Sequence, residues 1–247
     1  MPSRKILAVI LILSAWILVS VSGPSSSIYF PDFIKVWKRF FELVFTWGLY
    51  RDLLHTLARM YMAFIVASIS GTWVGLWLST KPVWFKTAEL PLEFMRALPS
   101  PVLFPLAVMF LGVEDIAKVA IAVYTCFFIN LFYAYYGARD VDRAKLDFFH
   151  SLKVPRREVV NRLLFWAALP SIFGGLRITL TVSLILIIIA EMLGGSPFGL
   201  GVRISNSTAP HLVAERYALI LILGLTGFLI NWLFSRVEKS VVHWQGA

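Results

Sequence analysis

Residues 139–170 read RDVDRAKLDFFHSLKVPRREVVNRLLFWAALP. This stretch holds seven Lys and Arg residues and separates two long apolar runs of the chain. Pro155 suits the first turn of a helix, where its missing N–H costs no hydrogen bond. We therefore predict two short helices that meet near Lys153 and form a hairpin. A charged hairpin between apolar spans is typical of a surface on which a soluble protein docks, so this stretch is the first candidate site.

The composition places the chain in a membrane. Hydrophobic residues make up 59% of its 247 residues and charged residues only 15%, which is far from the balance of a soluble domain. The excess apolar surface is expected to face lipid. The net charge of +9 comes from basic residues scattered between apolar runs, which indicates membrane topology rather than nucleic-acid binding. Cys126 is the single cysteine and the four histidines are isolated, so no metal site is predicted.

The apolar runs predict an all-α polytopic membrane protein with six transmembrane helices, because a membrane helix needs about 20 mainly apolar residues. The helices are expected near residues 6–22, 57–79, 95–112, 117–137, 172–193 and 217–236. With six spans both termini share one side. The segments on that side carry more Lys and Arg than those on the other, which favours cytoplasmic termini in a multi-pass protein of the cell membrane.

The division of the chain follows from these spans. Residues 1–56 are predicted to hold the first transmembrane helix and an outside linker, in which apolar residues recur at helical spacing as in an amphipathic helix of the membrane interface. Residues 57–247 would form a five-helix core that includes the segment 139–170. The first span has an alternative interpretation as a cleaved signal peptide, because Arg4 and Lys5 precede it and small residues follow it.

Two adjacent phenylalanines in the hairpin need cover from water. Phe149 recurs with Leu146 and Leu152 at three-residue spacing, and Phe148 lies beside it. One interpretation folds these rings back against the membrane helices. The other inserts at least one of them into a groove of a soluble partner, since aromatic anchors are frequent at interface cores.

Segments along nearly the whole chain, taken in order, resemble the permease subunits of ATP-binding cassette (ABC) importers, in the nitrate, sulfonate and taurine branch. These segments are HTLARMYMAFIVASISGTWVGL (55–76), LEFMRALPSPVLFPLAVMFLGV (92–113), FFINLFYAYYGARDVD (127–142), LPSIFGGLRITL (169–180) and AEMLGGSPFGLGVRI (190–204). The hairpin stands where that family has its cytoplasmic coupling loop, between helices 4 and 5.

The hairpin matches the family's loop pattern in spacing and departs from it in residue types. The family pattern has Glu-Ala-Ala, then Gly, then Ile-x-Leu-Pro. Here Asp147-Phe148-Phe149 stands at the first position, Lys153 at the Gly, and Ala167-x-Leu169-Pro170 at the end. The phenylalanines are much bulkier than alanines, and a Gly would take positive φ at no cost. Either the turn is built differently here, or the partner's groove matches this surface.

The resemblance implies partners and a coupling role. A pair of permease subunits, identical or different, would line the path for a sulfonate, nitrate or similar small anion, with an extracytoplasmic solute-binding protein outside and ATPase subunits inside. The chain has no GxxxxGK[ST], so ATP and Mg²⁺ would be bound by the ATPase, and this chain is expected to be no enzyme and to bind no cofactor. The residues expected to couple to the ATPase are Asp147, Phe148, Phe149, Leu152, Lys153, Pro155 and Arg156.

A second group of residues is predicted to line the translocation path. Prolines should kink or break the third span, and a broken membrane helix is tolerated where it lines a cavity. Glu191 is an ionisable group within a span, which suggests an ion or relay site, or a helix cap near Gly194. The path candidates are Pro99, Pro101, Pro105, Asn130, Tyr133, Ser183 and Glu191. The three polar residues among them, Asn130, Tyr133 and Ser183, would alternatively bond neighbouring helices.

Two other classes of protein were weighed against an importer subunit. An ion-coupled secondary transporter is expected to show paired broken helices in two related halves and intramembrane acids, whereas this chain shows one broken span and one acid. A membrane-embedded enzyme would need a nucleophile and base, and no such arrangement is found in the sequence.

Overall fold

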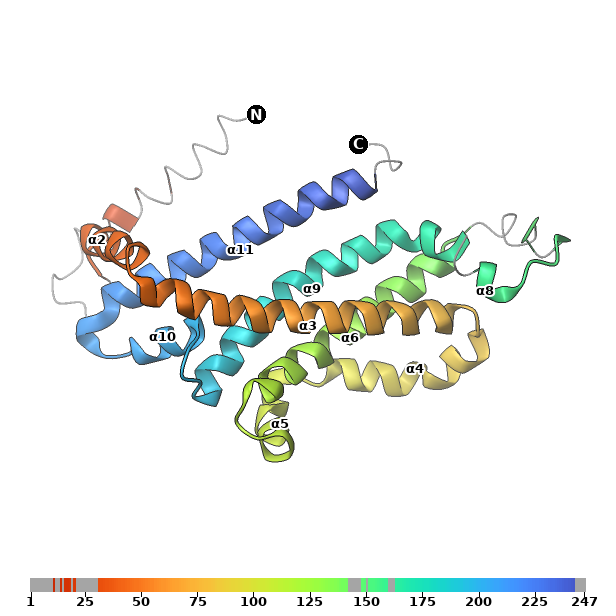
Figure 1. The fold of residues 1–247 in the computed structure, drawn as a ribbon, viewed down its shortest axis with the longest axis horizontal. Helices are drawn as coiled ribbons and strands as arrows, with labels where there is room; N and C mark the ends of the chain where they lie inside the picture. Colours follow the sequence, from red (N-terminus) through yellow and green to blue (C-terminus); the bar gives the residue numbers. More distant parts are fainter. Residues whose placement is uncertain are drawn as a thin grey trace.

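The computed structural model describes residues 31–141, 148–149, 151–159 and 163–242, with a few single residues between 11 and 20. Every regular element within these ranges is a helix (Figure 1). The helices are α2 (Phe33–Val44), α3 (Trp47–Ser79), α4 (Pro82–Ala97), η1 (Ser100–Leu103), α5 (Phe104–Leu111), α6 (Asp115–Arg139), α8 (Arg156–Val159), α9 (Phe165–Gly194), α10 (Leu200–Asn206), η3 (Pro210–Leu212) and α11 (Val213–Val241).

Four helices are long and apolar enough to cross a membrane, namely α3, α6, α9 and α11. They contain the spans predicted near 57–79, 117–137, 172–193 and 217–236, so these four predictions are confirmed. The predicted first span, near 6–22, lies for the most part outside the residues that the structure describes. The all-α class is confirmed for the described residues.

The third span differs from its prediction. The prediction of a single helix near 95–112 is wrong, because α4 and the pair η1–α5 form a broken unit with a bend of 82°. Pro99 lies at the break and has no N–H to continue a helix, and it holds Leu98 in an extended conformation with ψ 123°. Pro105 lies in the first turn of α5, where proline is tolerated. The prolines therefore break the chain as expected, but the helix before the break begins at Pro82.

Close contacts between small residues hold α3, α6 and α9 together. A Cβ atom added at Gly71 would lie 2.5 Å from the carbonyl oxygen of Phe127, and one at Gly75 would overlap the carbonyl oxygen of Leu131. Gly175 on α9 leaves the same kind of room for Tyr133 of α6. Glycines at these positions let the helix backbones approach closely, so α6 lies packed between α3 and α9.

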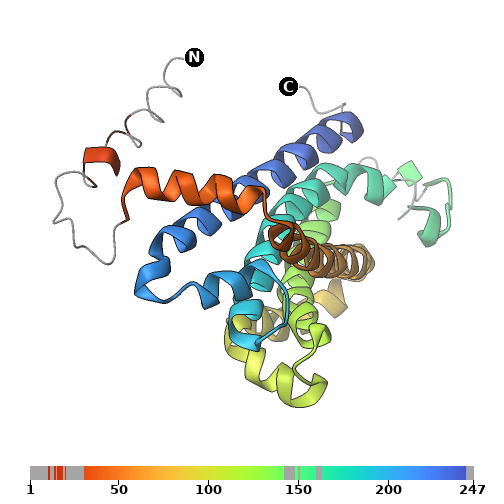
Figure 2. The same cartoon turned by 60° about the vertical axis from the view of Figure 1, so that its left-hand side comes forward.

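The predicted interfacial linker contains a helix, α2, but ends earlier than residue 56, because α3 already begins at Trp47. The predicted boundary between residues 56 and 57 thus falls inside α3. α2 lies across the start of α11 (Figure 2) and buries Val36 and Leu43. Arg39 bonds Glu215 of α11 at 2.7 Å. Hydrogen bonds to Glu215 and Glu42 raise the pKa of Arg39, so this tie stays charged.

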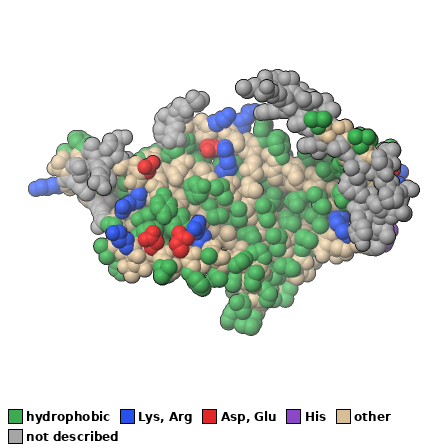
Figure 3. Space-filling model, turned by 180° about the vertical axis from the view of Figure 1, so that it is seen from behind, with side chains coloured by type: hydrophobic (Ala, Val, Ile, Leu, Met, Phe, Trp, Pro, Cys, Tyr) green, Lys and Arg blue, Asp and Glu red, His purple; other side chains and the backbone are tan. Residues whose placement is uncertain are grey.

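The outer surface matches a protein in lipid. A broad hydrophobic surface covers the middle and lower part of the face in Figure 3. Large apolar side chains on α3, α5 and α11 are exposed, and several belong to residues near the middle of long helices. Exposed apolar surface on this scale is expected only where lipid or protein covers it.

Candidate coupling elbow and translocation path

The described part of the predicted hairpin, residues 148–149 and 151–159, is here called the elbow. Its two phenylalanines have different surroundings. Phe148 is 61% exposed and Leu152, one helical turn later, is 59% exposed. Phe149 is half-buried and packs with Val154 against a cluster that includes Ala138. Phe149 thus folds back against the helices, as the first interpretation expects. Phe148 is exposed, and its insertion into a partner stays a prediction.

The turn of the elbow keeps the geometry that a glycine would provide. Lys153 has φ 51°, and no other described non-glycine residue has a positive φ. The N–H of Val154 donates to the carbonyl of Phe149 at 3.3 Å, a bond typical of helix ends closed by a left-handed residue. The turn is therefore built with the positive φ expected for the family's glycine, and Lys153 adopts it.

Pro155 opens the second helix of the elbow, as the sequence predicted. Its carbonyl accepts hydrogen bonds from the N–H groups of Glu158 and Val159, at 2.8 and 3.1 Å. Arg156 is the first residue of α8, and Asp147 lies outside the described residues. The structure therefore brings most of the predicted coupling residues into one elbow, while their role in coupling stays a prediction.

The predicted path residues fall into two groups. Pro99, Pro101 and Pro105 lie at the bend between α4 and α5, and Pro99 and Pro105 are exposed. The polar candidates instead lie in helix contacts. Asn130 is buried and donates to the hydroxyl of Thr179 at 2.9 Å.

The other two polar candidates differ from Asn130 in their contacts. Ser183 is buried and donates to the carbonyl of Leu180 at 3.0 Å. Tyr133 packs against Gly175, and its carbonyl accepts from Ser171 at 2.8 Å. Of the three polar candidates, only Asn130 therefore uses its polar side chain to join α6 to α9, since the Ser183 bond lies within α9 and Tyr133 accepts through its backbone. The path role of these residues stays a prediction.

Glu191 lies in a buried charge cluster. The residue is 1% exposed. Its carboxylate accepts from Arg59 of α3 at 2.6 Å, from the hydroxyl of Thr56 at 2.9 Å, and from the N–H of Gly201 at 2.9 Å. Partners of this kind offset the cost of removing a charge from water. The charge cluster comprises Asp52, Thr56, Arg59, Asp115, Lys118, Glu191 and Arg203.

The charge cluster also fastens the chain that follows α9. Asp52 accepts from the N–H of Gly199 at 3.3 Å and from Arg203 at 2.9 Å. The N–H of Leu200 donates to Thr56 at 2.9 Å. The residue before α10 and the start of α10 are therefore held against α3.

Arg59 is the main residue of the cluster that the sequence analysis did not single out. Its guanidinium bonds Glu191 and, at 2.9 Å, Asp115 at the start of α6. It also donates to the carbonyl of Phe198 at 2.9 Å. The available signal was Glu191 itself, since an acid inside a span calls for a basic partner.

Long apolar helices, a bent helix pair and a charged elbow together define a polytopic membrane transport component. The chain belongs to the family of binding-protein-dependent transport system inner membrane components, whose model matches residues 67–243. It is therefore a permease component of such a system and not itself an enzyme.

Relatives are similar over almost the whole chain. The putative aliphatic sulfonates transport permease protein SsuC of Bacillus subtilis is 22% identical over 96% of this chain and 85% of its own length. The nitrate import permease protein NrtB of Synechocystis is 23% identical, with 97% and 89% covered. The taurine transport system permease protein TauC of Escherichia coli is 22% identical, with 95% and 87% covered.

A solved structure shares the fold. A chain of the MetNI methionine ABC transporter, in an inward-facing conformation, superposes with a TM-score of 0.70 at 17% identity. The match covers 79% of this chain and 97% of that one. The helical arrangement described above is therefore that of an ABC importer permease.

Proposed function

We propose that the chain is the membrane-spanning subunit of an ATP-driven importer for a small oxyanion such as a sulfonate or nitrate. The family assignment and the names of the relatives support this function. The observation that carries the coupling role is the elbow, because it presents Phe148 and Leu152 to a partner while Phe149 and Val154 anchor it to the helices.

The proposed assembly has several parts that lie outside this chain. Separate ATPase subunits bind ATP and Mg²⁺ and dock on the elbow. An extracytoplasmic binding protein delivers the solute, and a second permease subunit completes the path. The chain itself crosses the cell membrane six times, with both termini and the elbow in the cytoplasm. In this arrangement the first span and the interfacial helix α2 precede a five-helix core.

Translocation would follow from motion of the elbow. ATP binding brings the two ATPases together, which draws the two elbows toward each other. Since Phe149 and Val154 pack against residues of α6 and α9, a displaced elbow moves both helices. The bend at Pro99 gives α4 and α5 a joint at which the path widens or closes.

The test compares three Phe→Asp variants in vesicles that contain the permease, its ATPase subunits and its binding protein. Phe148→Asp should reduce ATPase co-purification and solute-dependent ATP hydrolysis at least tenfold, because a charge replaces the exposed anchor. Phe45→Asp is the matched control, since Phe45 is 87% exposed and lies far from the elbow in sequence. The Phe45→Asp variant should retain ATPase co-purification and solute-dependent ATP hydrolysis.

Phe149→Asp separates docking from folding. Because Phe149 is packed against the helices, this variant should lower thermal stability as well as coupling. Normal ATPase capture and transport by Phe148→Asp would contradict the docking role of the elbow.

A further inference from the structure

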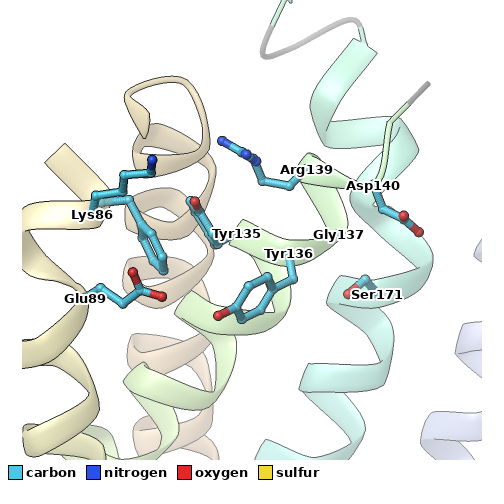
Figure 4. A pocket seen from close by; sticks show the side chains of 9 residues that line it. Lys86, Glu89, Tyr135, Tyr136, Gly137, Arg139, Asp140 and Ser171 are labelled. Carbon is cyan, nitrogen blue, oxygen red and sulfur yellow. The ribbon is translucent and has the colours of Figure 1, made fainter. Parts of the chain in front are cut away.

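A cleft of about 660 Å³ opens between α4, the end of α6 and the start of α9 (Figure 4). It lies at the same end of the helices as the elbow, because α6 ends at Arg139 just before the elbow begins. Its lining contains Lys86 and Glu89 from α4, Tyr135 and Arg139 from α6, and Ser171 from α9. Neither the coupling elbow nor the charge cluster includes these residues.

Two cations meet at one end of the cleft. Lys86 and Arg139 come from different helices, and Figure 4 shows both side chains extending to the same end with the Tyr135 hydroxyl between them. An ammonium offers three donors and a guanidinium five. Charge-assisted bonds of this kind are the strongest that an oxyanion accepts from a protein.

A carboxylate lies one helical turn away from the cations. Glu89 follows Lys86 on α4, and Figure 4 shows it pointing into the cleft below Lys86. Within the described residues neither Lys86 nor Glu89 has a hydrogen-bond or ion-pair partner from its side chain. A second carboxylate, Asp140, directly follows Arg139 and also lines the cleft. The cleft therefore presents charges of both signs.

The cleft has a rigid floor, and apolar side chains lie near it on α4. Phe85 is buried and stacks on Tyr135 with ring centroids 3.5 Å apart. Arg139 lies 6.0 Å from the centroid of the same tyrosine ring. Val83 and Leu90 lie on α4 about one turn before and one turn after Lys86 and are exposed. An aromatic side chain beside a polar cleft at a helix end is typical of the membrane interface.

We propose that this cleft binds an amino-oxyanion, a zwitterion that carries a tetrahedral oxyanion and an ammonium. The oxyanion would accept bonds from Lys86, Arg139 and the Tyr135 hydroxyl, and the ammonium would donate to Glu89. A net anion would lack a use for Glu89 and would be repelled by it. Basic pockets between membrane helices at the cytoplasmic side are known to take lipid head groups.

Two sources carry this chemistry. One is the head group of phosphatidylethanolamine, whose acyl chains would lie on the apolar surface of α4 near Val83 and Leu90. The other is a free aminosulfonate leaving the translocation path. This second source, and the cytoplasmic placement of the cleft, rest on the proposed function.

The lipid arm uses the full-length chain in nanodiscs of equal parts phosphatidylethanolamine and phosphatidylcholine, with tightly bound lipid counted by native mass spectrometry. The protein should retain phosphatidylethanolamine over phosphatidylcholine at least threefold. The double variant Lys86→Gln/Arg139→Gln should lose this preference. The matched control is Arg236→Gln/Lys239→Gln, which removes the same charges from exposed positions on α11 and should keep it.

Glu89→Gln tests the ammonium partner by itself. It should reduce the preference for phosphatidylethanolamine over phosphatidylcholine, because a quaternary ammonium donates no hydrogen bond and the wild-type discrimination depends on that bond. It should also increase retention of phosphatidylglycerol, since the repulsion of a net anion is removed.

The solute arm measures binding of radiolabelled taurine to the same chain in phosphatidylcholine nanodiscs by equilibrium dialysis. Taurine binding that the double variant abolishes would assign the cleft to a free aminosulfonate. Phosphatidylethanolamine enrichment without taurine binding would assign it to lipid. Equal retention of both lipids together with no taurine binding, or an unchanged double variant, would overturn the proposal.

Transport measurements keep this proposal separate from the proposed function. Loss of ATP-driven uptake in every reconstitution, with lipid enrichment intact, would count against the importer and leave the cleft standing. Normal uptake with neither ligand bound would count against the cleft alone.

Discussion

Lys153 holds a backbone conformation that L-residues rarely adopt, at the turn of the elbow. The left-handed region costs an ordinary residue about 1–2 kcal/mol relative to the right-handed one, and glycine avoids most of this cost. A lysine at this position therefore keeps a turn under strain. The strain is located where the elbow would meet its partner.

Lys153→Gly is expected to stabilise the elbow by about 1 kcal/mol, because glycine takes a φ of this sign freely. Hydrogen exchange of residues 148–159 should slow in the variant. Ser151→Gly is the control, since Ser151 lies in a helical turn, and it should speed exchange instead. Faster exchange in Lys153→Gly would show that the lysine side chain itself holds the turn.

Glu191 and Arg59 form a pair whose members depend on each other. Both are buried, and the side chain of Glu191 is fully enclosed. Asp115, the other acidic partner of Arg59, is much more exposed. Glu191 therefore supplies the buried half of the compensation for the guanidinium.

Glu191→Gln should destabilise the protein by about 3–5 kcal/mol, since removing one partner of a buried pair leaves the other charge uncompensated. Thermal unfolding in detergent measures the loss. Glu93→Gln is the control, because Glu93 pairs with Arg96 on the surface of α4, and surface pairs contribute no more than about 1 kcal/mol. A similar melting temperature for both variants would refute the structural role of Glu191.

Helix α6 owes its central place to glycines on its neighbours. The approach of α3 to α6 is possible only where side chains are absent, at Gly71 and Gly75. In a membrane, packing of this kind replaces the hydrophobic effect as the source of helix association. The GxxxG pattern in α3 is thus a contact and not a chance match.

Gly75→Val should separate α3 from α6 and reduce stability by about 1–3 kcal/mol or more, because extra methyl groups in a closely packed contact force the backbones to shift. Gly224→Val on α11 is the matched control, since no atom lies within 4 Å of an added Cβ there. Thermal unfolding of both variants in detergent compares them. Equal stability would mean that α3 and α6 tolerate a wider spacing.

The sequence predicted the long apolar helices and the amphipathic helix α2, and it missed α4. Helices α3, α6, α9 and α11 follow from long apolar runs. α4 was missed because Lys86, Glu89, Glu93 and Arg96 interrupt its hydropathy, and the charge-free run after it drew the predicted span toward residue 112.

The candidate sites divide along a similar line. The elbow was predictable because its residues are close in sequence. The bond between Arg59 and Glu191 joins residues 132 positions apart, and spacing along a chain carries no information about such a pair. The cleft at Lys86 and Arg139 was missed for the same reason, since it needs the ends of three helices to meet.

At the scale of the whole molecule, the proposed topology of six crossings with both ends inside predicts a labelling pattern. Single cysteines at Ser151 and Ser240, on a Cys126→Ala background, should react with a membrane-impermeant maleimide only after the membrane is opened. A cysteine at Lys38, on α2, should react from outside in intact cells. Cys126 is a free, buried thiol. Its replacement by alanine leaves the introduced cysteine as the single thiol that can be labelled. Labelling of Ser151→Cys in intact cells would reverse the proposed orientation.

Helix α9 is held by contacts near both ends. Near its start, Ala168 belongs to the apolar cluster against which Phe149 packs, and near its other end Glu191 forms the ion pair with Arg59. Its 30 residues span about 45 Å at 1.5 Å per residue. Pro170 lies near the start of α9, and the proline-free stretch from there to Glu191 would move as one unit. Work done by a motor on one side of the bilayer would reach the opposite rim as displacement of α3 and α10, without any signal having to pass from residue to residue.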